Sequence, residues 1–407
     1  MSTDSKSHPK VPYFCPDIGS EEIEEVVECL KSGWLTTGPK TKQFENEFAD
    51  FVHAKNAIAL NSCTAALHLA VVALGLQPKQ AVLVPTMTFA ATAEVVQYCN
   101  AIPILVDCEA STLNMDLDDA EAKILAVRSG KTPLSTNIKI AGIMPVHVGG
   151  LMMNMDEVNA FAEKYGLWVV EDAAHALPAS YRNNSTSAWK RCGESTADVT
   201  CFSFYANKTI TTGEGGMAVC SSDKIAEQIR TLSLHGLSRD AWRRFSGGSW
   251  DYQIELPGYK YNLTDIAAAI GIHQLKKAEL LRSQREAVAN FYLEAFSDND
   301  FFNLPARSQD RLHSWHLFPI RLNTSEVESN RNQMIGQLKE KAINTSVHWR
   351  PLHLHPHYQQ TAHWQIDSLP VASREWARLI SLPIYPTIKS EQLNYITEVL
   401  PNICKLL

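Results

Sequence analysis

A lysine and an aspartate, each following an apolar run, are the residues of this sequence best placed for covalent chemistry. The run Val199–Ser203 leads to Lys208, just before a glycine-rich turn, and the run Trp168–Glu171 leads directly to Asp172. If both runs are strands of one sheet, the amine and the carboxylate converge at the same edge. A desolvated lysine amine forms imines, and a carboxylate keeps a pyridine nitrogen protonated. Pyridoxal phosphate (PLP) is the cofactor that needs both groups.

Other polar or aromatic residues follow the neighbouring runs. Asn61–Thr64 begins a helical pattern after a strand, and the free N–H groups of a helix start suit a phosphate, although the same hydroxyls could simply cap the helix. Phe89 could stack on a flat ring or belong to the core. His175 and Ser203 could equally be hydrogen-bonded core residues. The order of these residues along one predicted sheet edge, rather than any single residue, indicates a cofactor site.

Short apolar runs predict the strands of a central seven-stranded sheet: Ala57–Leu60, Ala81–Val84, Pro103–Val106, Lys139–Val146, Trp168–Glu171, Val199–Ser203 and Met217–Val219. Helical patterns separate several of the early runs: Thr64–Leu74, Ala90–Cys99 and Met155–Tyr165. This alternation predicts an α/β fold whose mostly parallel sheet is covered by helices on both faces. The gap before the last run is too short for a crossover helix, so we expect that strand to run antiparallel. Ligands bind beyond the carboxyl ends of such strands.

The two ends of the chain differ from this central part. We expect residues 1–13 to form a flexible arm, followed by a helix from Ser20 that stops at Gly33 and a second helix through Val52. A long helical pattern from Asn262 to Phe296 connects to a smaller C-terminal α/β domain. There, two strand candidates flank a helix and a further helix follows: strands Leu317–Leu322 and Asn344–Val347, helix Ser373–Leu379. We therefore predict a PLP-binding large domain over 14–261 and a linking helix with a small domain over 262–407.

Composition narrows the class of protein. The 407 residues can bury a large core, and 37 basic against 44 acidic residues give a net charge of −7 without a nucleic-acid or anionic-membrane footprint. Nine scattered cysteines without a C-x-x-C pair indicate reduced thiols. The polar N-terminus lacks the apolar centre of a signal peptide, and no apolar run is long enough for a membrane span. We therefore expect a cytoplasmic enzyme with no nucleic-acid or membrane partner.

Seven segments follow one another along nearly the whole chain in a familiar order: 33–40, 62–70, 88–93, 170–176, 203–208, 213–217 and 257–266. Together they resemble the DegT-type nucleotide-sugar aminotransferases, which are PLP enzymes of fold type I. The resemblance implies that Lys208 forms a Schiff base with PLP and later moves a proton. It implies that Asp172 pairs with the ring nitrogen of the cofactor and that Phe89 stacks on the ring.

The same resemblance assigns the rest of the cofactor site. Thr64, the backbone at Cys63, and Ser203 would hold the phosphate, and His175 stands where many members have glutamine. Asn262 would reach the phosphate bound by the other subunit, because the family builds each site across a homodimer interface. Cys63 departs from the glycine that is usual at its position, and its side chain could crowd the phosphate loop.

The resemblance also implies two half-reactions. An amino acid, expected to be L-glutamate, gives its amino group to the cofactor, and a keto-sugar nucleotide then takes it. The stretch 238–250 resembles members that act at C4 of UDP- or dTDP-linked sugars, which favours amino-sugar and polysaccharide biosynthesis. We expect substrate contacts from Thr36 and Tyr205, and from the histidine-rich loop 346–357 through His348 and His355.

Three alternatives remain open from the sequence. The alternating histidines of the loop could bind zinc on one strand face, although no acidic or thiol ligand stands beside them; we expect no metal. A PLP-dependent sugar dehydratase would have a histidine in place of Lys208, as the family pattern implies. A non-catalytic PLP- or sugar-binding regulatory protein would not need both Lys208 and Asp172.

Overall fold

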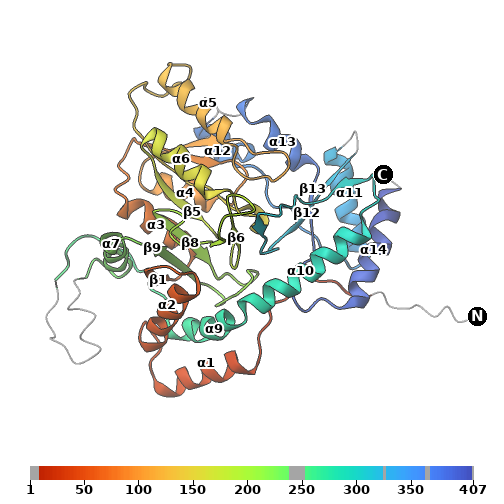
Figure 1. Ribbon diagram of the computed structural model, residues 1–407, viewed down its shortest axis with the longest axis horizontal. Helices are drawn as coiled ribbons and strands as arrows, with labels where there is room; N and C mark the ends of the chain where they lie inside the picture. Colours follow the sequence, from red (N-terminus) through yellow and green to blue (C-terminus); the bar gives the residue numbers. More distant parts are fainter. Residues whose placement is uncertain (1–8, 238–252, 324–326, 363–366, 406–407) are drawn as a thin grey trace, which may run out of the picture.

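The protein is represented by a computed structural model that describes residues 9–237, 253–323, 327–362 and 367–405. Seven strands form the central sheet in the order β1-β9-β8-β5-β4-β2-β3 (Figure 1). Their bounds are β1 Asn56–Leu60, β2 Ala81–Pro85, β3 Ile102–Val106, β4 Ile140–Ile143, β5 Trp168–Asp172, β8 Val199–Ser203 and β9 Gly216–Cys220. Only β9 runs against its neighbours β1 and β8 within this sheet. The predicted α/β class, the seven strands and the reversed last strand are confirmed.

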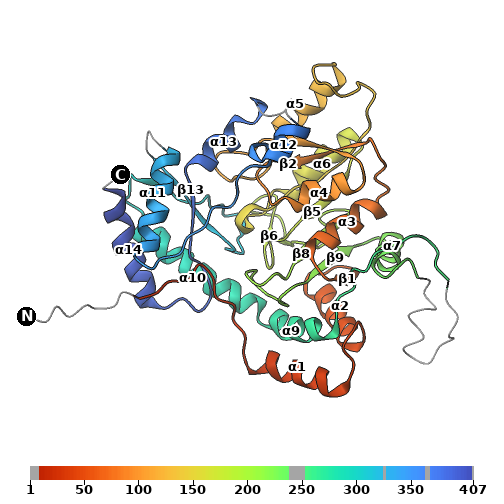
Figure 2. The same ribbon diagram turned by 180° about the vertical axis from the view of Figure 1, so that it is seen from behind.

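Helices cover both faces of the sheet because its strands are apolar on both sides. Along β1, Ala57 and Ala59 join one core cluster while Ile58 and Leu60 join the other, since successive side chains of a strand point to opposite faces. One cluster packs against α2, α5, α6 and α9 and the other against α3, α4 and α7 (Figures 1 and 2). The bounds are α2 Pro39–Phe51, α3 Cys63–Ala73, α4 Ala91–Tyr98, α5 Leu117–Arg128, α6 Met155–Tyr165, α7 Asp223–Ser233 and α9 Asp265–Lys276.

Capping residues in the sequence account for where several helices begin and end. Ser62 accepts a hydrogen bond from the N–H of Ala65 at the start of α3, and Thr264 does the same for Ala267 at the start of α9. Helix α1 (Ser20–Ser32) ends at Gly33, which has a φ of 75° in the left-handed region. The first helix and its predicted glycine stop are therefore confirmed.

A second, smaller sheet has the antiparallel order β10-β12-β13 and lies beside helices α10, α11 and α14 (Figures 1 and 2). The bounds are α10 Ala278–Ala295, β10 Phe302–Asn303, β12 Phe318–Leu322, α11 Val327–Glu340, β13 Leu379–Leu382 and α14 Ser390–Cys404. Helix α10 runs from the large sheet to this smaller one. The remaining elements are short: β6 Ser180–Tyr181, β7 Lys190–Arg191, β11 Arg311–Leu312, η1 Val148–Gly150, η3 Leu352–Leu354, α12 Pro356–Thr361 and α13 Pro370–Ala377.

For the C-terminal part, one predicted strand is wrong and two predicted helices have different bounds. The segment Asn344–Val347 is not a strand, because its only pairing is an isolated bridge from Ser346 to Ser381. The strand beside β12 is β13, so the helix predicted over Ser373–Leu379 ends at Ala377 and its last apolar residue belongs to the sheet. Short apolar runs fit either structure by pattern, and pairing with β12 decides between them here. The long connecting helix is two helices, α9 and α10, which meet at Lys277.

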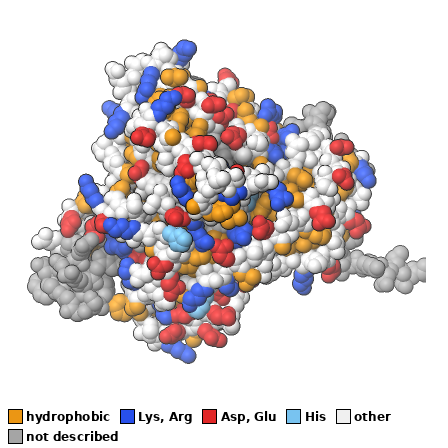
Figure 3. All heavy atoms as spheres, in the orientation of Figure 1, with side chains coloured by type: hydrophobic (Ala, Val, Ile, Leu, Met, Phe, Trp, Pro, Cys, Tyr) orange, Lys and Arg blue, Asp and Glu red, His pale blue; other side chains and the backbone are white. Residues whose placement is uncertain are grey.

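The N-terminal arm is anchored within its predicted range. Val11 is fully buried in the core of the smaller sheet and pairs with Ile343. Residues 1–8 of the predicted arm and the stretch 238–250 lie outside the described residues, and the domain limits stay predictions. No helix among the described residues has both the length and the apolar character needed to cross a membrane. Acidic and basic side chains are interspersed on the face shown in Figure 3.

Candidate active site

A cavity of about 560 Å³ lies beyond the carboxyl ends of β1, β5 and β8. It gathers nine of the residues that the sequence singles out: Cys63, Thr64, Phe89, Asp172, His175, Ser203, Tyr205, Lys208 and His348. These residues come from the start of α3, from the ends of β5 and β8 and from loops that lie far apart in the sequence. The sheet brings them together because its parallel strands deliver their carboxyl ends to one edge. The predicted convergence of Lys208 and Asp172 on one cavity is confirmed.

Lys208 stands in the tight connection between β8 and β9. Its N–H donates to the carbonyl of Tyr205 at 2.9 Å, and the N–H of Phe204 donates to the carbonyl of Gly215 at 2.9 Å, so the turn folds back on itself. Burial lowers the pKa of Lys208 to about 8, although Asp172 acts in the opposite direction. A lysine with such a pKa has a much larger neutral, nucleophilic fraction at physiological pH than an exposed one.

Asp172 ends β5 with its carboxylate held from two sides. One oxygen accepts a hydrogen bond from Thr92 Oγ1 at 2.8 Å and the other from the N–H of Ala174 at 3.1 Å. The side chain is only 5% exposed. Burial raises the pKa of Asp172, and the two hydrogen bonds and the nearby Lys208 counteract that rise. A carboxylate fixed in this way can hold the protonated nitrogen of a ligand in the cavity.

The start of α3 lies at the cavity wall with N–H groups that suit an anion. Ser62 Oγ takes the N–H of Ala65 at 3.1 Å, while the N–H groups of Cys63 and Thr64 have no partner among the described residues. The cap therefore leaves N–H groups for an anion, because capping uses a different N–H group. A Cβ at Gly216 would lie 2.4 Å from the carbonyl carbon of Ser62, so only glycine lets β9 pass this close.

Three predicted residues, Cys63, Ser203 and Phe89, adjoin this helix start or the cavity opening. The Sγ of Cys63 lies 3.7 Å from the carbonyl oxygen of Cys201 and donates to it, so the thiol turns toward β8. Burial raises the pKa of Cys63 well above its ordinary value, which keeps the thiol protonated. Ser203 Oγ accepts from the N–H of Tyr205 at 3.3 Å. Phe89 is 63% exposed, an unusual fraction for a phenylalanine, and its ring is available to a ligand.

Sequence reasoning missed His316 at the cavity wall and the hydrogen-bond network behind Asp172. His316, which precedes β12, lines the cavity, and its ring centre lies 4.1 Å from that of His175. The His175 ring also stacks on Trp349, with 4.9 Å between ring centres. The pattern His313-Ser-Trp-His316 in the sequence does not distinguish the ring that faces the cavity from the one that packs elsewhere. The turn before β12 determines that His316, and not His313, faces the cavity.

The network behind Asp172 centres on its neighbour Glu171, which is fully buried. Its Oε1 lies 2.6 Å from Nε2 of His147, and its Oε2 accepts from Thr196 and Thr200, each at 2.6 Å. Burial alone would raise the pKa of Glu171, but these hydrogen bonds hold it below its ordinary value. The N–H of Met153 donates to Nδ1 of His147, so Nε2 is the ring atom that donates to Glu171.

This network fixes the end of β5 from the side opposite the cavity. Asp172 N–H donates to the carbonyl of Pro145 at 2.9 Å, and the N–H of His147 donates to the carbonyl of Asp172. Potential metal ligands come close enough to share an ion at only one place among the described residues, where His147, Glu171 and Cys192 meet. Their ligand atoms instead form hydrogen bonds with one another and with Thr196 and Thr200. This arrangement is a structural hydrogen-bond network rather than a metal site.

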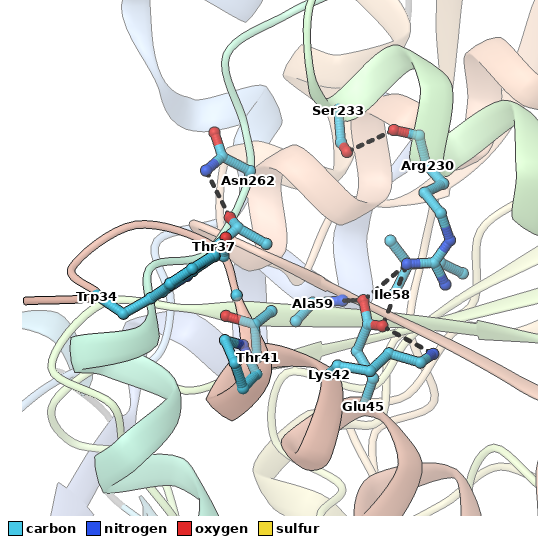
Figure 4. A pocket seen from close by; sticks show the side chains of 12 residues that line it. Trp34, Thr37, Thr41, Lys42, Glu45, Ile58, Ala59, Arg230, Ser233 and Asn262 are labelled. Carbon is cyan, nitrogen blue, oxygen red and sulfur yellow. Dashed lines mark hydrogen bonds and ion pairs between the residues drawn. The ribbon is translucent and has the colours of Figure 1, made fainter. Parts of the chain in front are cut away.

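Three predicted site residues do not line this cavity. Asn262 lines a second pocket of about 450 Å³, where its Nδ2 donates to Thr37 Oγ1 at 2.7 Å (Figure 4). Thr36 is exposed, and its carbonyl accepts from the N–H of Asp265. His355 is exposed too, with Nε2 3.2 Å from the carbonyl of Arg350. If these three residues act in catalysis, they must therefore contact something other than the cavity of their own chain, such as the site of a second subunit.

The histidines of the loop 346–357 lie apart. His353 is buried between Thr86 Oγ1, at 2.8 Å from its Nδ1, and Ser373 Oγ, at 2.7 Å from its Nε2. His357 is exposed and contacts Gln97, while His348 faces the cavity. Each ring has its own partners, which speaks against the zinc alternative for this loop.

Comparisons with known proteins agree with this arrangement. A model of the DegT/DnrJ/EryC1/StrS aminotransferase family matches residues 16–401. The spore coat polysaccharide biosynthesis protein SpsC of Bacillus subtilis is 41% identical over 97% of both chains. The PLP form of Spr1654 from Streptococcus pneumoniae is 31% identical, with a TM-score of 0.86 over 98% of this chain and 99% of that one. Helicobacter pylori PseC, an aminotransferase involved in the biosynthesis of pseudoaminic acid, is 25% identical, with a TM-score of 0.86 over 98% of this chain and 100% of that one.

Proposed function

Because the chain belongs to the DegT/DnrJ/EryC1/StrS aminotransferase family, we propose that it moves an amino group from L-glutamate to a keto-sugar nucleotide. The acceptor in this proposal is a 4-keto sugar linked to UDP or dTDP, which is aminated at C4. Family membership makes the protein a PLP-dependent sugar aminotransferase. The observation that carries the proposal is that Lys208 and Asp172 line one cavity at the carboxyl ends of the strands.

The names of two relatives support a sugar acceptor. SpsC is named for spore coat polysaccharide biosynthesis, and PseC for the biosynthesis of pseudoaminic acid. The choice of C4 rests on the stretch 238–250, whose sequence resembles members that act at that carbon. The nine cysteines are all free thiols in the structure, which supports a reducing, cytoplasmic setting. We place the product in amino-sugar and polysaccharide biosynthesis.

The residues present fit PLP at each of its functional groups. The start of α3, with unpartnered N–H groups at Cys63 and Thr64, suits the phosphate. Asp172 offers a buried carboxylate for the ring nitrogen, and Lys208 offers an amine with a lowered pKa for the aldehyde. Phe89 exposes an aromatic face that a ring would cover. We assign Ser203 to the phosphate and His175 to the same cofactor site.

The reaction then follows from what these side chains can do. Bound PLP supplies an electron sink for the negative charge that develops when the donor α-carbon loses its proton. Lys208 Nζ in its neutral form takes that proton, and in the second half-reaction it delivers a proton to the sugar carbon that gains nitrogen. Asp172 stabilises the protonated ring nitrogen throughout, since Thr92 and Ala174 fix the orientation of its carboxylate. Tyr205 and His348, both at the cavity wall, are placed to contact the substrates.

We also propose a homodimer in which Asn262 and Thr36 of one chain serve the site of the other. Helix α1 carries an exposed apolar stripe, Ile23, Val27 and Leu30, at helical spacing. Asn262 lies in a separate pocket with Trp34 and Thr37, at the surface rather than in the catalytic cavity (Figure 4). A second copy seated on α1 would cover the apolar stripe and could bring Asn262 to the phosphate site.

The proposed activity is tested with purified protein loaded with PLP. Addition of L-glutamate alone should change the absorbance band of the bound cofactor, and a panel of 3-keto and 4-keto sugar nucleotides should restore it. We expect restoration by a UDP- or dTDP-linked 4-keto sugar, with an amino sugar detected by mass spectrometry. Response to an amino acid without response to any keto-sugar nucleotide would contradict the proposed acceptor class.

A further inference from the structure

Three histidines of the cavity each leave one ring nitrogen to a ligand. We call His175, His316 and His348 the histidine cluster. The N–H of Gly149 donates to Nδ1 of His175 at 3.3 Å. The hydroxyl oxygens of Ser381 and Tyr13 lie 3.0 Å and 3.3 Å from Nδ1 of His348. The hydrogen bonds that the described residues make to this cluster all involve Nδ1, so Nε2 is the atom left for the cavity.

His316 shows the clearest lack of a partner. It is 5% exposed, and its Nδ1 is buried without a hydrogen bond in the described part of the chain. Buried N–H groups without an acceptor are rare in folded proteins, which places the ring proton on Nε2. Burial, with His175, Lys208 and Arg285 nearby, lowers the pKa of His316 well below its ordinary value. The ring is therefore a neutral N–H donor at the cavity wall.

A buried guanidinium lies behind the cluster. Arg285 is 3% exposed, and its Nη1 donates to the carbonyls of Trp315 at 3.4 Å and Ile384 at 2.8 Å. Among the residues that the structure describes, no carboxylate forms an ion pair with it. Burial lowers the pKa of Arg285 to about 10, which leaves it charged at neutral pH. Because Trp315 precedes His316 directly, this charge acts on the cluster, and a buried charge without a counterion favours an anion nearby.

We propose that the histidine cluster binds the α-carboxylate of the amino-acid donor through His316 and His348, since the proposed function assigns His175 to the cofactor. This assignment rests on the proposed aminotransferase function and names the group that recognises its first substrate. A carboxylate only accepts hydrogen bonds, so it matches a set of N–H donors better than a sugar hydroxyl does, since a hydroxyl must also donate. Among the described residues that line the cavity, Lys208 is the only lysine or arginine, and its amine is needed for the proton transfer. The cluster is thus the remaining place for the carboxylate.

The test compares two substitutions of His316 in PLP-loaded protein. His316→Phe keeps a ring of similar shape but removes both nitrogens, whereas His316→Gln keeps an N–H donor near the position of Nε2. The apparent dissociation constant for L-glutamate, read from the cofactor absorbance, should rise about ten- to hundredfold in the Phe variant. It should rise less than about fivefold in the Gln variant. His313→Phe is the matched control, because His313 is also buried but stacks on Trp315 outside the cavity.

A second experiment runs the reverse half-reaction, in which a UDP-linked 4-amino sugar is the donor and the cofactor starts as PLP. The His316→Phe variant should use this amine as the unchanged protein does, since it carries no α-carboxylate. An unchanged dissociation constant for L-glutamate in that variant would overturn the assignment, and so would a loss confined to the amino sugar. If His316→Phe weakened the binding of both donors equally, and His316→Gln did not restore it, His316 would have only a structural role. A failure of the unsubstituted protein to respond to any amino acid would instead contradict the aminotransferase proposal itself.

Discussion

Glu171 and His147 form a fully buried pair, with 2.6 Å between Oε1 and Nε2, directly behind the residue that faces the cofactor cavity. Glu171 and Asp172 are consecutive in β5, so their side chains point to opposite faces of the strand. Asp172 faces the cavity, while Glu171 anchors the strand end to His147, Thr196 and Thr200. The position of the Asp172 carboxylate therefore depends on a network of side chains that do not line the cavity.

Glu171→Gln should destabilise the protein and loosen the cofactor. An amide in place of the carboxylate leaves at least one buried donor of this network without an acceptor, which costs about 1–3 kcal/mol for each such group. We expect a loss of about 2 kcal/mol or more in the free energy of unfolding, measured with urea on cofactor-free protein, and weaker PLP binding. Glu121→Gln is the control, because Glu121 contacts Lys164 at the surface and should change stability by less than about 0.5 kcal/mol. Equal effects of the two substitutions would contradict a special role for Glu171.

Asp172→Asn should separate cofactor binding from catalysis. The amide keeps the shape of the side chain but loses the charge that holds a proton on the ring nitrogen, so turnover should fall about 100- to 1000-fold. Bound PLP, measured by absorbance after gel filtration, should remain. Thr92→Val removes the hydrogen bond to Asp172 Oδ2, together with the contacts of the same hydroxyl to Thr88 Oγ1 and the carbonyl of Phe89, and should cause a smaller loss. Turnover of the Asp172→Asn variant within tenfold of the unchanged protein would rule out this role.

The rate at which the cofactor-free protein takes up PLP should depend on pH through Lys208. The neutral amine is the reactive form, and the folded protein lowers its pKa to about 8. The rate should therefore rise about tenfold per pH unit below pH 8 and level off above it. Stopped-flow absorbance measures this directly. A lysine of ordinary pKa, about 10.4, would instead show a rate that still climbs beyond pH 10.

Sites shared between subunits can be tested by mixing two inactive variants. If Asn262 of one chain serves the Lys208 of the other, Lys208→Ala and Asn262→Ala homodimers are each impaired. After subunit exchange, a mixed dimer contains one intact site, and equal mixing should restore roughly a quarter of the activity for a symmetric dimer. Activity assays after exchange under mild denaturant provide the measurement. Absence of any recovery, with exchange shown by native mass spectrometry, would place Asn262 in the site of its own chain or outside catalysis.

The sequence was sufficient to predict the large sheet and the residues at its edge. Apolar runs bounded by polar residues define each strand of that sheet, and their carboxyl ends deliver Lys208 and Asp172 to one cavity. The reversed β9 also follows from the short gap before it. These features depend on local patterns and on rules of strand connection, both of which are readable from the residues.

The rest depends on contacts that no local pattern encodes. Leu379–Leu382 is apolar enough for a helix end or a strand, and only pairing with β12 decides. Lys277, at the junction of α9 and α10, contacts Asp17 and Glu22, which are far away in the sequence. His316 and Glu171 stand in unremarkable sequence surroundings, and their partners come from distant segments. Only the family resemblance points to Asn262, Thr36 and His355, and within one chain these residues do not line the cavity.

The most direct measurement identifies the residue that holds the cofactor. Reduction of the PLP-loaded protein with sodium borohydride, followed by proteolysis and mass spectrometry, should find the pyridoxyl group on Lys208 and on no other lysine. Prior addition of L-glutamate should prevent this labelling, because the amine of Lys208 is then free to carry the proton. A label on a different lysine, or labelling that glutamate does not affect, would contradict the role of Lys208 in amino-group transfer.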